Sequence, residues 1–316
     1  MKKVINFTVN SEDKGKRLDI FLSEKMNNTR SEIKKMIDKE LVLLNDKLPK
    51  KAGQSLKVGS NIKILEEKFK LGVDFTKKIK IIKDTNDYII IDKPSGLLVH
   101  PTDRNEVNTL TDWLLSEYSQ VKGVGESVDR PGIVHRLDKE ASGVMVIAKN
   151  KKMFEHLKKQ FKDRTISKYY TVLVHGILDM KHDKIDFDIN RGHDGKMVAR
   201  PKIDNFKVKN VGKEQEGREA LTEYWVEKEY TRFSLLKVKI HTGRTHQIRV
   251  HMLAYAHPVV GDSLHFNKKL NRKKDEKLGR IFLHASELCF EDLQGKKVCY
   301  NSNLPKKLKD FIKELN

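Results

Sequence analysis

Residues 131–149 read PGIVHRLDKEASGVMVIAK, and they predict the frame of a functional site. An acidic residue, Asp138, stands between a short apolar segment, Ile133-Val134, and a longer one, Val144–Ile147. Both segments are short, β-branched and bounded by turn residues, so we expect buried strands on either side of Asp138. Cations two residues before and one residue after Asp138 favour its ionised form. This arrangement suits a carboxylate that takes part in chemistry, although charged clusters in turns are also commonly solvated.

The composition indicates a globular protein with a polyanionic partner. Of 316 residues, 34% are charged and 38% hydrophobic, which allows one sizeable core and a small accessory domain. The net charge of +20 attracts polyanions, of which nucleic acid is the commonest for a basic protein. A lysine-rich surface also arises in organisms with low-GC genomes, so charge supports RNA binding only in part.

The sequence predicts neither export nor a membrane span. No apolar run approaches the roughly 20 residues that cross a bilayer, and the N-terminus lacks the pattern of a signal peptide. We therefore expect a cytoplasmic protein. In that setting the two cysteines, Cys289 and Cys299, are expected to be buried thiols rather than a disulfide.

Residues 1–70 form a separate unit in this interpretation. Apolar residues at helical spacing predict two helices, around residues 18–22 and 33–37. Short strands are expected at 41–44 and 62–64, with a turn at Asn45-Asp46. Residues 66–78 are charged and weakly periodic, as in a connection between domains.

From residue 79 to residue 316, short β-branched runs dominate. We expect strands at 79–82, 88–91, 144–148, 171–174, 221–226 and 233–240, and helices around 110–114 and 154–161. Because many strands follow one another directly, a largely antiparallel mixed sheet with peripheral helices is expected, an α+β fold. The charge run 267–280 is expected to be an exposed loop, whose seven Lys and Arg residues are available to a nucleic-acid backbone.

Four motifs resemble those of the RluA-type RNA pseudouridine synthases, in the same order. The family pattern HRLDxxTSGxxxxAK matches residues 135–149, except that Ala141 stands where Thr is usual. The other motifs are KPSGLLVHP at 93–101, KYY at 168–170 with VHG at 174–176, and TGRTHQIRVHM at 242–252. The resemblance covers about residues 80–310 and implies the α+β pseudouridine synthase fold and the conversion of uridine to pseudouridine in RNA.

The N-terminal unit resembles the S4 RNA-binding domain. The likeness rests on the pattern RLDxxL at residues 17–22, on TRS at 29–31 and on the turn at Asn45. It implies that Arg17, Arg30 and Lys34 contact RNA. The alternative is a basic helical cap that only supports folding.

Asp138 is the candidate catalytic residue. Pseudouridine formation breaks the C1′–N1 bond, turns the uracil and rejoins it through C5, and it needs a carboxylate, a platform for the base and a dry charged pocket. Asp138 could attack C1′ or remove the 2′ proton, and the sequence does not choose between these roles.

The resemblance gives three further residues a role. Arg249 pairs with Asp138, Tyr170 stacks on the uracil, and Arg136 fills the gap that the flipped nucleotide leaves. The alternating residues around Arg249 predict a strand, on which its side chain points away from Ile248 and Val250. Tyr169 competes with Tyr170, and the two point to opposite faces. As alternatives, these residues are a sheet arginine, a core tyrosine and a solvated loop arginine.

Two weaker candidates lie in the motif at 93–101. Lys93 and His100 are each at least as suited to shaping the fold. The 12 histidines suggest no metal site, because those at 241, 246, 251 and 257 fit neither a helical pair nor a zinc finger. The chain lacks HExxH, CxxC and a phosphate-binding glycine loop, so we expect no metal and no cofactor.

We therefore expect a monomeric RNA pseudouridine synthase. Large-subunit (23S) ribosomal RNA is the expected substrate, because the S4-bearing members that the chain resembles mostly act there, and transfer RNA is the nearest alternative. A catalytically inactive RNA-binding ribosome-assembly protein is the alternative from another class, and the intact set Asp138, Tyr170 and Arg249 argues against it. A metal-dependent nuclease would need clustered carboxylates, which the motifs do not supply.

Overall fold

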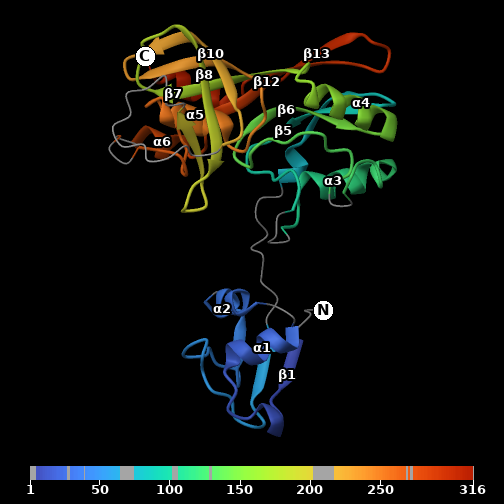
Figure 1. The fold of residues 1–316 in the computed structure, drawn as a ribbon, viewed down its shortest axis with the longest axis vertical. Helices are drawn as coiled ribbons and strands as arrows, with labels where there is room; N and C mark the ends of the chain where they lie inside the picture. Colours follow the sequence, from blue (N-terminus) through green and yellow to red (C-terminus); the bar gives the residue numbers. More distant parts are fainter. Residues whose placement is uncertain are drawn as a thin grey trace. The chain divides into compact units, whose positions relative to one another are not determined.

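The computed structural model describes residues 5–26, 29–38, 40–64, 75–101, 106–127, 130–201, 217–267, 270 and 273–315. The chain divides into an N-terminal unit, Met1–Val73, and a C-terminal unit, Asp74–Asn316 (Figure 1). Most of the connection expected at 66–78 lies outside the described residues. Its end, Phe75–Lys78, forms the short 3-10 helix η2.

The N-terminal unit packs two helices against a small sheet. Helices α1 (Leu18–Met26) and α2 (Arg30–Asp38) accompany strands β1 (Ile5–Thr8), β2 (Val42–Leu44) and β3 (Asn61–Ile64), and a 3-10 helix, η1 (Ser11–Asp13), follows β1. The antiparallel strand order is β1-β3-β2. The apolar residues that predicted the helices form the core, with Leu18, Leu22 and Ile33 fully buried. The two expected helices and two expected strands are confirmed, and β1 is an additional strand.

The C-terminal unit is built on one 10-stranded sheet. Its strands are β4 (Lys80–Asp84), β5 (Tyr88–Lys93), β6 (Ser142–Ala148), β7 (Ser167–His175), β8 (His182–Arg191), β9 (Met197–Pro201), β10 (Leu221–Tyr230), β11 (Phe233–Ile240), β12 (Leu283–Glu291) and β13 (Lys297–Asn301). Their order is β4-β5-β6-β12-β7-β11-β10-β8-β9, with β13 paired to β12. Among the described strands, only the β6–β12 pairing is parallel. The mixed, largely antiparallel sheet and the six expected strands are confirmed.

Helices flank the two halves of this sheet. Helices α3 (Leu110–Glu117) and α4 (Lys151–Lys162) lie beside β5 and β6, whereas α5 (Gln247–Ala254) lies beside β8 and β10 (Figure 1). The 3-10 helix η3 (Ser119–Val121) follows α3. Helix α4 begins where the Asn150 side chain accepts a hydrogen bond from the Met153 N–H at 2.9 Å, which satisfies a free donor of the first turn. Both helices expected here are confirmed.

The charge run 267–280 is not simply an exposed loop. Residues 268–269 and 271–272 lie outside the described part, but Lys273–Leu278 form helix α6, with Asp275 and Leu278 buried. The Asp275 carboxylate lies 3.2 Å from Nε2 of His175 and accepts from the Gly261 N–H at 3.0 Å. Leu278 packs in a second core cluster with Leu308 of α7 (Lys306–Lys313). A few buried side chains therefore hold a highly charged segment against the sheet.

The expectation of two free thiols is wrong. Cys289 of β12 and Cys299 of β13 lie directly opposite one another and form a disulfide. Directly opposed residues of an antiparallel pair have neighbouring β-carbons, so the hairpin brings these two sulfurs together.

The β6–β12 junction depends on a glycine. Gly143 has a φ of +123°, and a β-carbon added there would lie 2.2 Å from the carbonyl oxygen of Ala285 in β12. A residue with a side chain would therefore combine an unfavourable backbone conformation with a steric clash. This glycine allows β6 to join the two halves of the sheet.

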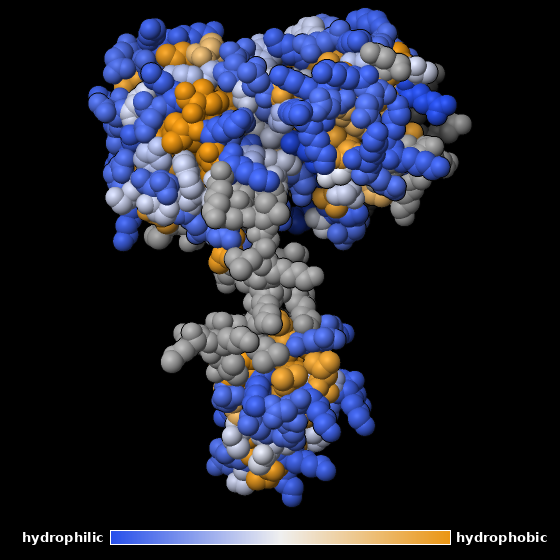
Figure 2. Space-filling model, turned by 180° about the vertical axis from the view of Figure 1, so that it is seen from behind, coloured by the Kyte–Doolittle hydropathy of each residue, from blue (hydrophilic) through white to orange (hydrophobic). Residues whose placement is uncertain are grey.

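The visible surface is mainly hydrophilic. Figure 2 shows hydrophilic residues over most of one face of each unit, with smaller apolar patches. Among the described residues, no helix is long and apolar enough to cross a membrane.

Candidate active site

Asp138 lies on the loop that leads into β6. The apolar segment after it is part of β6, as expected, but the segment before it makes only a single bridge, Ile133 to Ile147, rather than a strand. The loop is therefore framed by β6 on one side and by side-chain contacts on the other.

Two of the four residues of HRLD anchor this loop, and the other two face outward. Nε2 of His135 accepts a hydrogen bond from the Val146 N–H of β6 at 3.1 Å, and burial lowers the pKa of His135 to about 3, so it stays neutral. Leu137 is buried in the core. Arg136 is exposed, and Asp138 is half-buried. Anchoring residues thus alternate with residues that face outward.

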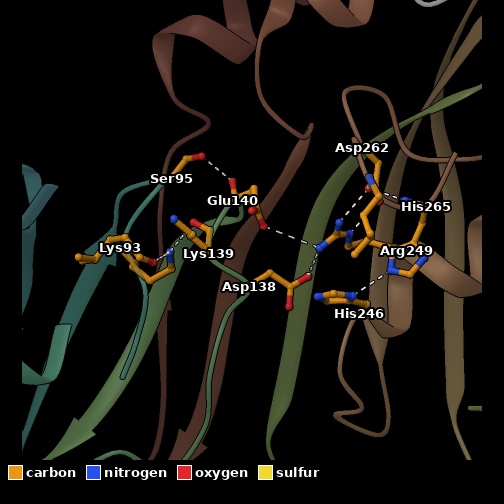
Figure 3. Close-up of polar contacts among 11 residues, drawn as sticks. Lys93, Ser95, Asp138, Lys139, Glu140, His246, Arg249, Asp262 and His265 are labelled. Atoms are coloured by element: carbon orange, nitrogen blue, oxygen red, sulfur yellow. Dashed lines mark hydrogen bonds and ion pairs between the residues drawn. The ribbon is translucent and has the colours of Figure 1, made fainter. Parts of the chain in front are cut away.

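The motif at 93–101 clamps the same loop from behind (Figure 3). The Lys139 carbonyl oxygen accepts from the Gly96 N–H at 2.7 Å, and the Glu140 carbonyl oxygen accepts from the Ser95 hydroxyl at 2.5 Å. The clamp therefore joins the KPSG segment to the two residues that directly follow HRLD.

Lys93 is fully buried at the centre of the clamp. Its Nζ donates to the carbonyl oxygens of Leu97, Pro94 and Lys139 at 2.7, 3.0 and 3.3 Å. Burial lowers the pKa of Lys93 to about 7, while the charge of Asp138 acts in the opposite direction. Three carbonyl acceptors match three ammonium hydrogens, so the set of bonds is complete only when Lys93 is charged.

Arg249 lies on a helix, and the expected strand is wrong. Helix α5 begins at Gln247, directly after His246, whose φ of +56° turns the chain. The sequence alternates polar and apolar residues here, but the helix is short and buried from residue 247 to residue 252. Because both faces are buried, the helical periodicity of apolar residues is lost, and the segment resembles a strand.

The polar residues of the arginine motif fix the start of α5. Oε1 of Gln247 accepts from the Thr242 hydroxyl at 2.7 Å and from the Arg244 N–H at 3.0 Å. His251 is fully buried, with Nε2 2.8 Å from the Phe187 carbonyl oxygen and Nδ1 2.9 Å from the Thr222 hydroxyl. Burial lowers the pKa of His251 to about 4, so this histidine is neutral.

Arg249 lies between the carboxylates of Asp138 and Asp262, and a third carboxylate, that of Glu140, lies 3.9 Å from its Nη1 (Figure 3). Its Nη1 donates to Oδ2 of Asp138 at 3.0 Å, while Nε and Nη2 donate to the two oxygens of Asp262 at 2.7 and 2.8 Å. The Arg249 side chain is 4% exposed, Asp262 0% and Asp138 17%, so solvent reaches only the Asp138 end of the triad. The two carboxylates raise the pKa of Arg249 despite its burial.

Asp262 is a residue of the candidate site that the sequence did not reveal. Burial alone would raise the pKa of Asp262, but the bonds from Arg249 hold it below its usual value. Its Oδ1 also accepts from the N–H groups of Leu264 and His265, both at 2.9 Å. The signal in the sequence is only a Gly-Asp-Ser turn, which is typical of a local side-chain to backbone bond and says nothing of a distant arginine.

A pair of histidines closes the site beside Asp138. Nδ1 of His246 lies 2.8 Å from Nε2 of His265, so one ring donates to the other. Burial lowers the pKa of His246, although the charge of Asp138 opposes this, and burial lowers the pKa of His265 to about 4. Two neutral rings satisfy this contact.

Asp138 opens into a cavity of about 530 Å³. Tyr170 of β7 lines the cavity, together with Arg136 and Arg249, whereas Tyr169 does not. Instead Tyr169 lies under the ammonium group of Lys237, which is 4.5 Å from its ring centroid. The cavity therefore brings together the four residues that the motifs singled out on this unit.

Tyr170 and Arg136 occupy different parts of the cavity wall. Burial, together with the charge of Asp138, raises the pKa of Tyr170, so its phenol is protonated. The exposed Arg136 has Nη1 3.3 Å from Nε2 of His100, and Nδ1 of His100 lies 2.9 Å from the Pro101 carbonyl oxygen. His100 thus orients Arg136 at the edge of the cavity.

The candidate RNA contacts of the N-terminal unit form a second, smaller cluster. Asp19, 5% exposed, accepts from Arg17 at 2.9 Å and from Arg30 at 3.3 Å. The two arginine side chains are still 50% and 57% exposed. Lys34 is exposed one helical turn after Arg30. Asp19 therefore holds two guanidinium groups in place while leaving them open to solvent.

No cluster of three or more metal-ligating side chains occurs in the described part of the chain. The site as built is a carboxylate, an arginine that is itself anchored by a second carboxylate, an aromatic ring and a neutral histidine pair around a hollow.

The RNA pseudouridylate synthase family matches residues 87–254, more than half of the chain, and this range contains Asp138, Tyr170 and Arg249. The chain belongs to this family. It is an RNA pseudouridine synthase of the RluA type, as its motifs indicated. An S4 domain matches residues 16–62, so the synthase also carries a small RNA-binding domain.

Relatives of this synthase span most of its length. A protein of Aquifex aeolicus described as an uncharacterized RNA pseudouridine synthase is 41% identical over 83% of this chain and 80% of its own. Ribosomal large subunit pseudouridine synthase D of Buchnera aphidicola is 32% identical over 94% of each chain. The solved structure of human RNA Pseudouridylate Synthase Domain Containing 4 has a TM-score of 0.61 at 26% identity, covering 76% of this chain and 94% of its own. The expected pseudouridine synthase fold is confirmed.

Proposed function

We propose that this synthase converts uridine to pseudouridine in large-subunit ribosomal RNA, with Asp138 as its catalytic residue. The observation that carries the proposal is the triad of Asp138, Arg249 and Asp262 at the cavity. Oδ2 of Asp138 accepts from Arg249, whereas Oδ1 has no hydrogen-bond partner among the described residues. This free oxygen belongs to the only partly exposed member of the triad and is available to a ribose in the cavity.

Arg249 keeps the carboxylate ionised when RNA fills the cavity. Closing the site removes water from Asp138, which would otherwise favour the protonated form. The guanidinium opposes this effect, and Asp262 fixes its orientation through two parallel bonds. An ionised Asp138 serves equally for attack at C1′ and for removal of the 2′ proton.

Tyr170 supplies the face on which the target uracil stacks. A base that leaves its helix is commonly read by stacking against an aromatic side chain. Because the pKa of Tyr170 is raised, the phenol is neutral in the free enzyme and offers a stacking surface and one O–H donor. The raised pKa also disfavours a phenolate base at this position in the free enzyme.

Arg136 occupies the space that the flipped nucleotide leaves in the RNA. It stands exposed at the cavity edge, and a planar guanidinium both stacks and donates hydrogen bonds. His100 restricts its position through the contact at 3.3 Å.

The N-terminal unit, residues 1–70, binds the RNA outside the catalytic domain at 79–316. Arg17, Arg30 and Lys34 contact phosphates, and Asp19 holds the two arginines in an exposed arrangement. Fixed, exposed guanidinium groups lose little freedom on binding phosphate.

Ribosomal RNA is proposed as the substrate because two relatives carry that assignment in their names. They are the ribosomal large subunit pseudouridine synthases D of Buchnera aphidicola and of Zymomonas mobilis, the latter 33% identical over 75% of this chain. Pseudouridine mapping in RNA from cells with and without the protein tests this. A site lost from large-subunit RNA supports it, whereas a site lost only from transfer RNA moves the substrate to that class.

The catalytic assignment is tested with Asp138→Asn. Asn keeps the size of the side chain but can act neither as a nucleophile nor as a carboxylate base, so we expect no tritium release from C5-labelled uridine RNA. RNA binding should persist, because it rests on Lys and Arg contacts to phosphate and on stacking. Turnover that persists in the variant would remove Asp138 from this role. A wild-type protein without turnover on any RNA would favour an inactive RNA-binding assembly protein.

A further inference from the structure

A second hollow lies behind the catalytic loop. This basic groove, of about 910 Å³, is lined by parts of the segments 78–82, 92–96, 139–142, 279–280 and 301–307. Leu137, Asp138 and Ala141 line the active-site cavity, whereas Lys139, Glu140 and Ser142 line the groove. The loop is therefore a wall shared by the two hollows.

The groove is strongly cationic. Seven Lys and Arg side chains line it, against two carboxylates, Asp92 and Glu140. Asp92 lies opposite Lys80 in the β4–β5 register, and its charge also acts on Lys93 and Arg280. Lys93 is buried and already bonded to three carbonyl oxygens, and Arg280 is half-buried, whereas the other five cations are exposed. Their combined field attracts an anion.

Arg280 is the central residue of this groove. Nη2 donates to the Ser142 hydroxyl at 2.8 Å and Nε to the Ile281 carbonyl oxygen at 3.2 Å. No ion pair joins it to a carboxylate among the described residues, although it is half-buried and burial lowers its pKa to about 10. Three of its five N–H groups are thus left for a ligand, and only the more distant charge of Asp92 offsets the cost of its burial.

The first turn of α7 adds two cations to the groove, at the helix N-terminus. Lys306 and Lys307 follow the N-cap Pro305, and the first turn contains no acidic residue. Lysines are unfavourable at a helix N-terminus, where an anion is favoured. The Nζ of Lys307 comes within 3.6 Å of where a β-carbon of Gly279 would lie, directly beside Arg280.

The floor of the groove is fixed by hydrogen bonds. The Ser142 hydroxyl, which accepts from Arg280, lies 3.0 Å from Nδ1 of His284, and Nε2 of His284 lies 3.0 Å from the Ser302 carbonyl oxygen. Arg280 is therefore held in place from β6 and β12 rather than free to turn into solvent.

We propose that the basic groove binds a backbone phosphate of the substrate RNA, outside the nucleotide that enters the active-site cavity. Arg280 meets the phosphate at the floor, and Lys306 and Lys307 meet it from α7. Because the two hollows share the catalytic loop, one RNA molecule can place its target uridine in the cavity and a flanking phosphate in the groove. The inference rests on the proposed function, action on RNA. A free nucleotide carries the same kind of phosphate, so the groove's chemistry alone does not distinguish the two ligands.

The test compares two double variants on the same helix. Lys306→Gln with Lys307→Gln removes two charges at the groove, whereas Lys309→Gln with Lys313→Gln removes two exposed charges that do not line it. For each variant, the affinity for an RNA that the wild-type enzyme modifies is measured over a series of salt concentrations. The groove variant should bind on the order of tenfold more weakly, with a log–log salt slope shallower by about one to two, and the control should match wild type. Equal slopes for the two variants overturn the proposal.

Two further measurements separate the possible explanations. Inorganic phosphate and uridine monophosphate are titrated onto the wild type and the groove variant. If these ligands need Lys306 and Lys307 but the salt slope of RNA binding is unchanged in the variant, the groove binds a small phosphate ligand. That result would contradict the RNA contact. Asp138→Asn is carried through the same salt series and should keep the wild-type slope. Turnover by Asp138→Asn would overturn the catalytic proposal while leaving the comparison of slopes intact.

Discussion

Arg249 presents three donor atoms in one plane, and each meets a carboxylate oxygen. A lysine in its place keeps one positive charge but cannot reach Asp138 and both oxygens of Asp262 at once. We expect Arg249→Lys to lower kcat on the order of 100-fold, because Asp138 loses its fixed partner and moves from its working position. Tritium release under single-turnover conditions measures this loss.

Arg244→Lys is the matched control. Arg244 also lines the cavity, but among the described residues its side chain makes only one hydrogen bond, from Nε to the Glu219 carbonyl oxygen at 3.0 Å. Its replacement should change kcat by less than about tenfold. An equal loss in both variants would mean that the planar fork of Arg249 is not what turnover requires.

His251 gives the catalytic domain a pH-dependent stability. Its pKa is about 4 in the fold against 6.5 for the ordinary side chain, so the unfolded chain binds the extra proton first. Stability should therefore fall as the pH drops from 6.5 to 4, by about 3 kcal/mol from this residue. Denaturant unfolding at several pH values should show a smaller fall over this interval for His251→Gln. Parallel curves for the variant and the wild type would contradict the assignment.

At this scale the sequence predicted residues that line the cavity, but not those that hold them in position. Asp138, Arg136 and Tyr170 stand in contiguous motifs, so their types and spacing are visible along the chain. Asp262 acts only through a bond across 13 residues to a helix whose orientation the sequence does not give. The histidine pair at 246 and 265 depends in the same way on folding.

The parallel pairing of β6 with β12 rests on a single glycine. Gly143→Ala adds a β-carbon 2.2 Å from a backbone oxygen and places alanine at a φ of +123°. We expect a loss of about 2–4 kcal/mol in the free energy of unfolding, because strand separation or strain must follow. Turnover should fall as well, since Asp138 lies on the loop that enters β6.

Gly123→Ala separates the effect of the backbone conformation from the effect of the steric clash. Gly123 has a φ of +80° but nothing lies within 4 Å of its added β-carbon, so only the backbone conformation is penalised. The expected cost is about 1 kcal/mol, without a change in kcat. Similar losses of stability for the two alanine variants would show that contact with β12 is not the cause.

Elements were predictable where one pattern dominated and obscure where two competed. The run 88–91 is apolar and β-branched, and β5 covers it. In α5, alternating residues in a short helix buried on both faces imitate a strand. In α6, a mostly charged sequence conceals two buried side chains. The disulfide was missed because the expected compartment, rather than the register of a hairpin, decided the prediction.

The two units have separate hydrophobic cores. The core of the N-terminal unit comprises residues between 9 and 64, and those of the C-terminal unit residues between 88 and 315. Deleting residues 1–73 should therefore leave a cooperatively folding catalytic domain whose RNA binding has a shallower salt slope. Circular dichroism and filter binding measure the two effects. An unfolded remainder, or an unchanged slope, would contradict this prediction.

A triple substitution tests the same surface within the full chain. Arg17→Gln, Arg30→Gln and Lys34→Gln remove the proposed phosphate contacts, and Lys50→Gln, Lys51→Gln and Lys57→Gln remove as many exposed charges elsewhere in the unit. Only the first set should flatten the slope. The thermal stability of both triple variants is measured as well, because the first set removes the two arginine partners of Asp19.

The ion pair between Asp138 and Arg249 joins residues 111 positions apart. During synthesis at about 5–20 residues per second, Asp138 leaves the ribosome roughly 6–22 seconds before Arg249, and Asp262 follows later still. A nascent chain therefore exposes HRLD without the cation that completes it. The set of contacts around Asp138 can therefore be completed only after residues 249 and 262 have both been synthesised, however early the strands before them pair.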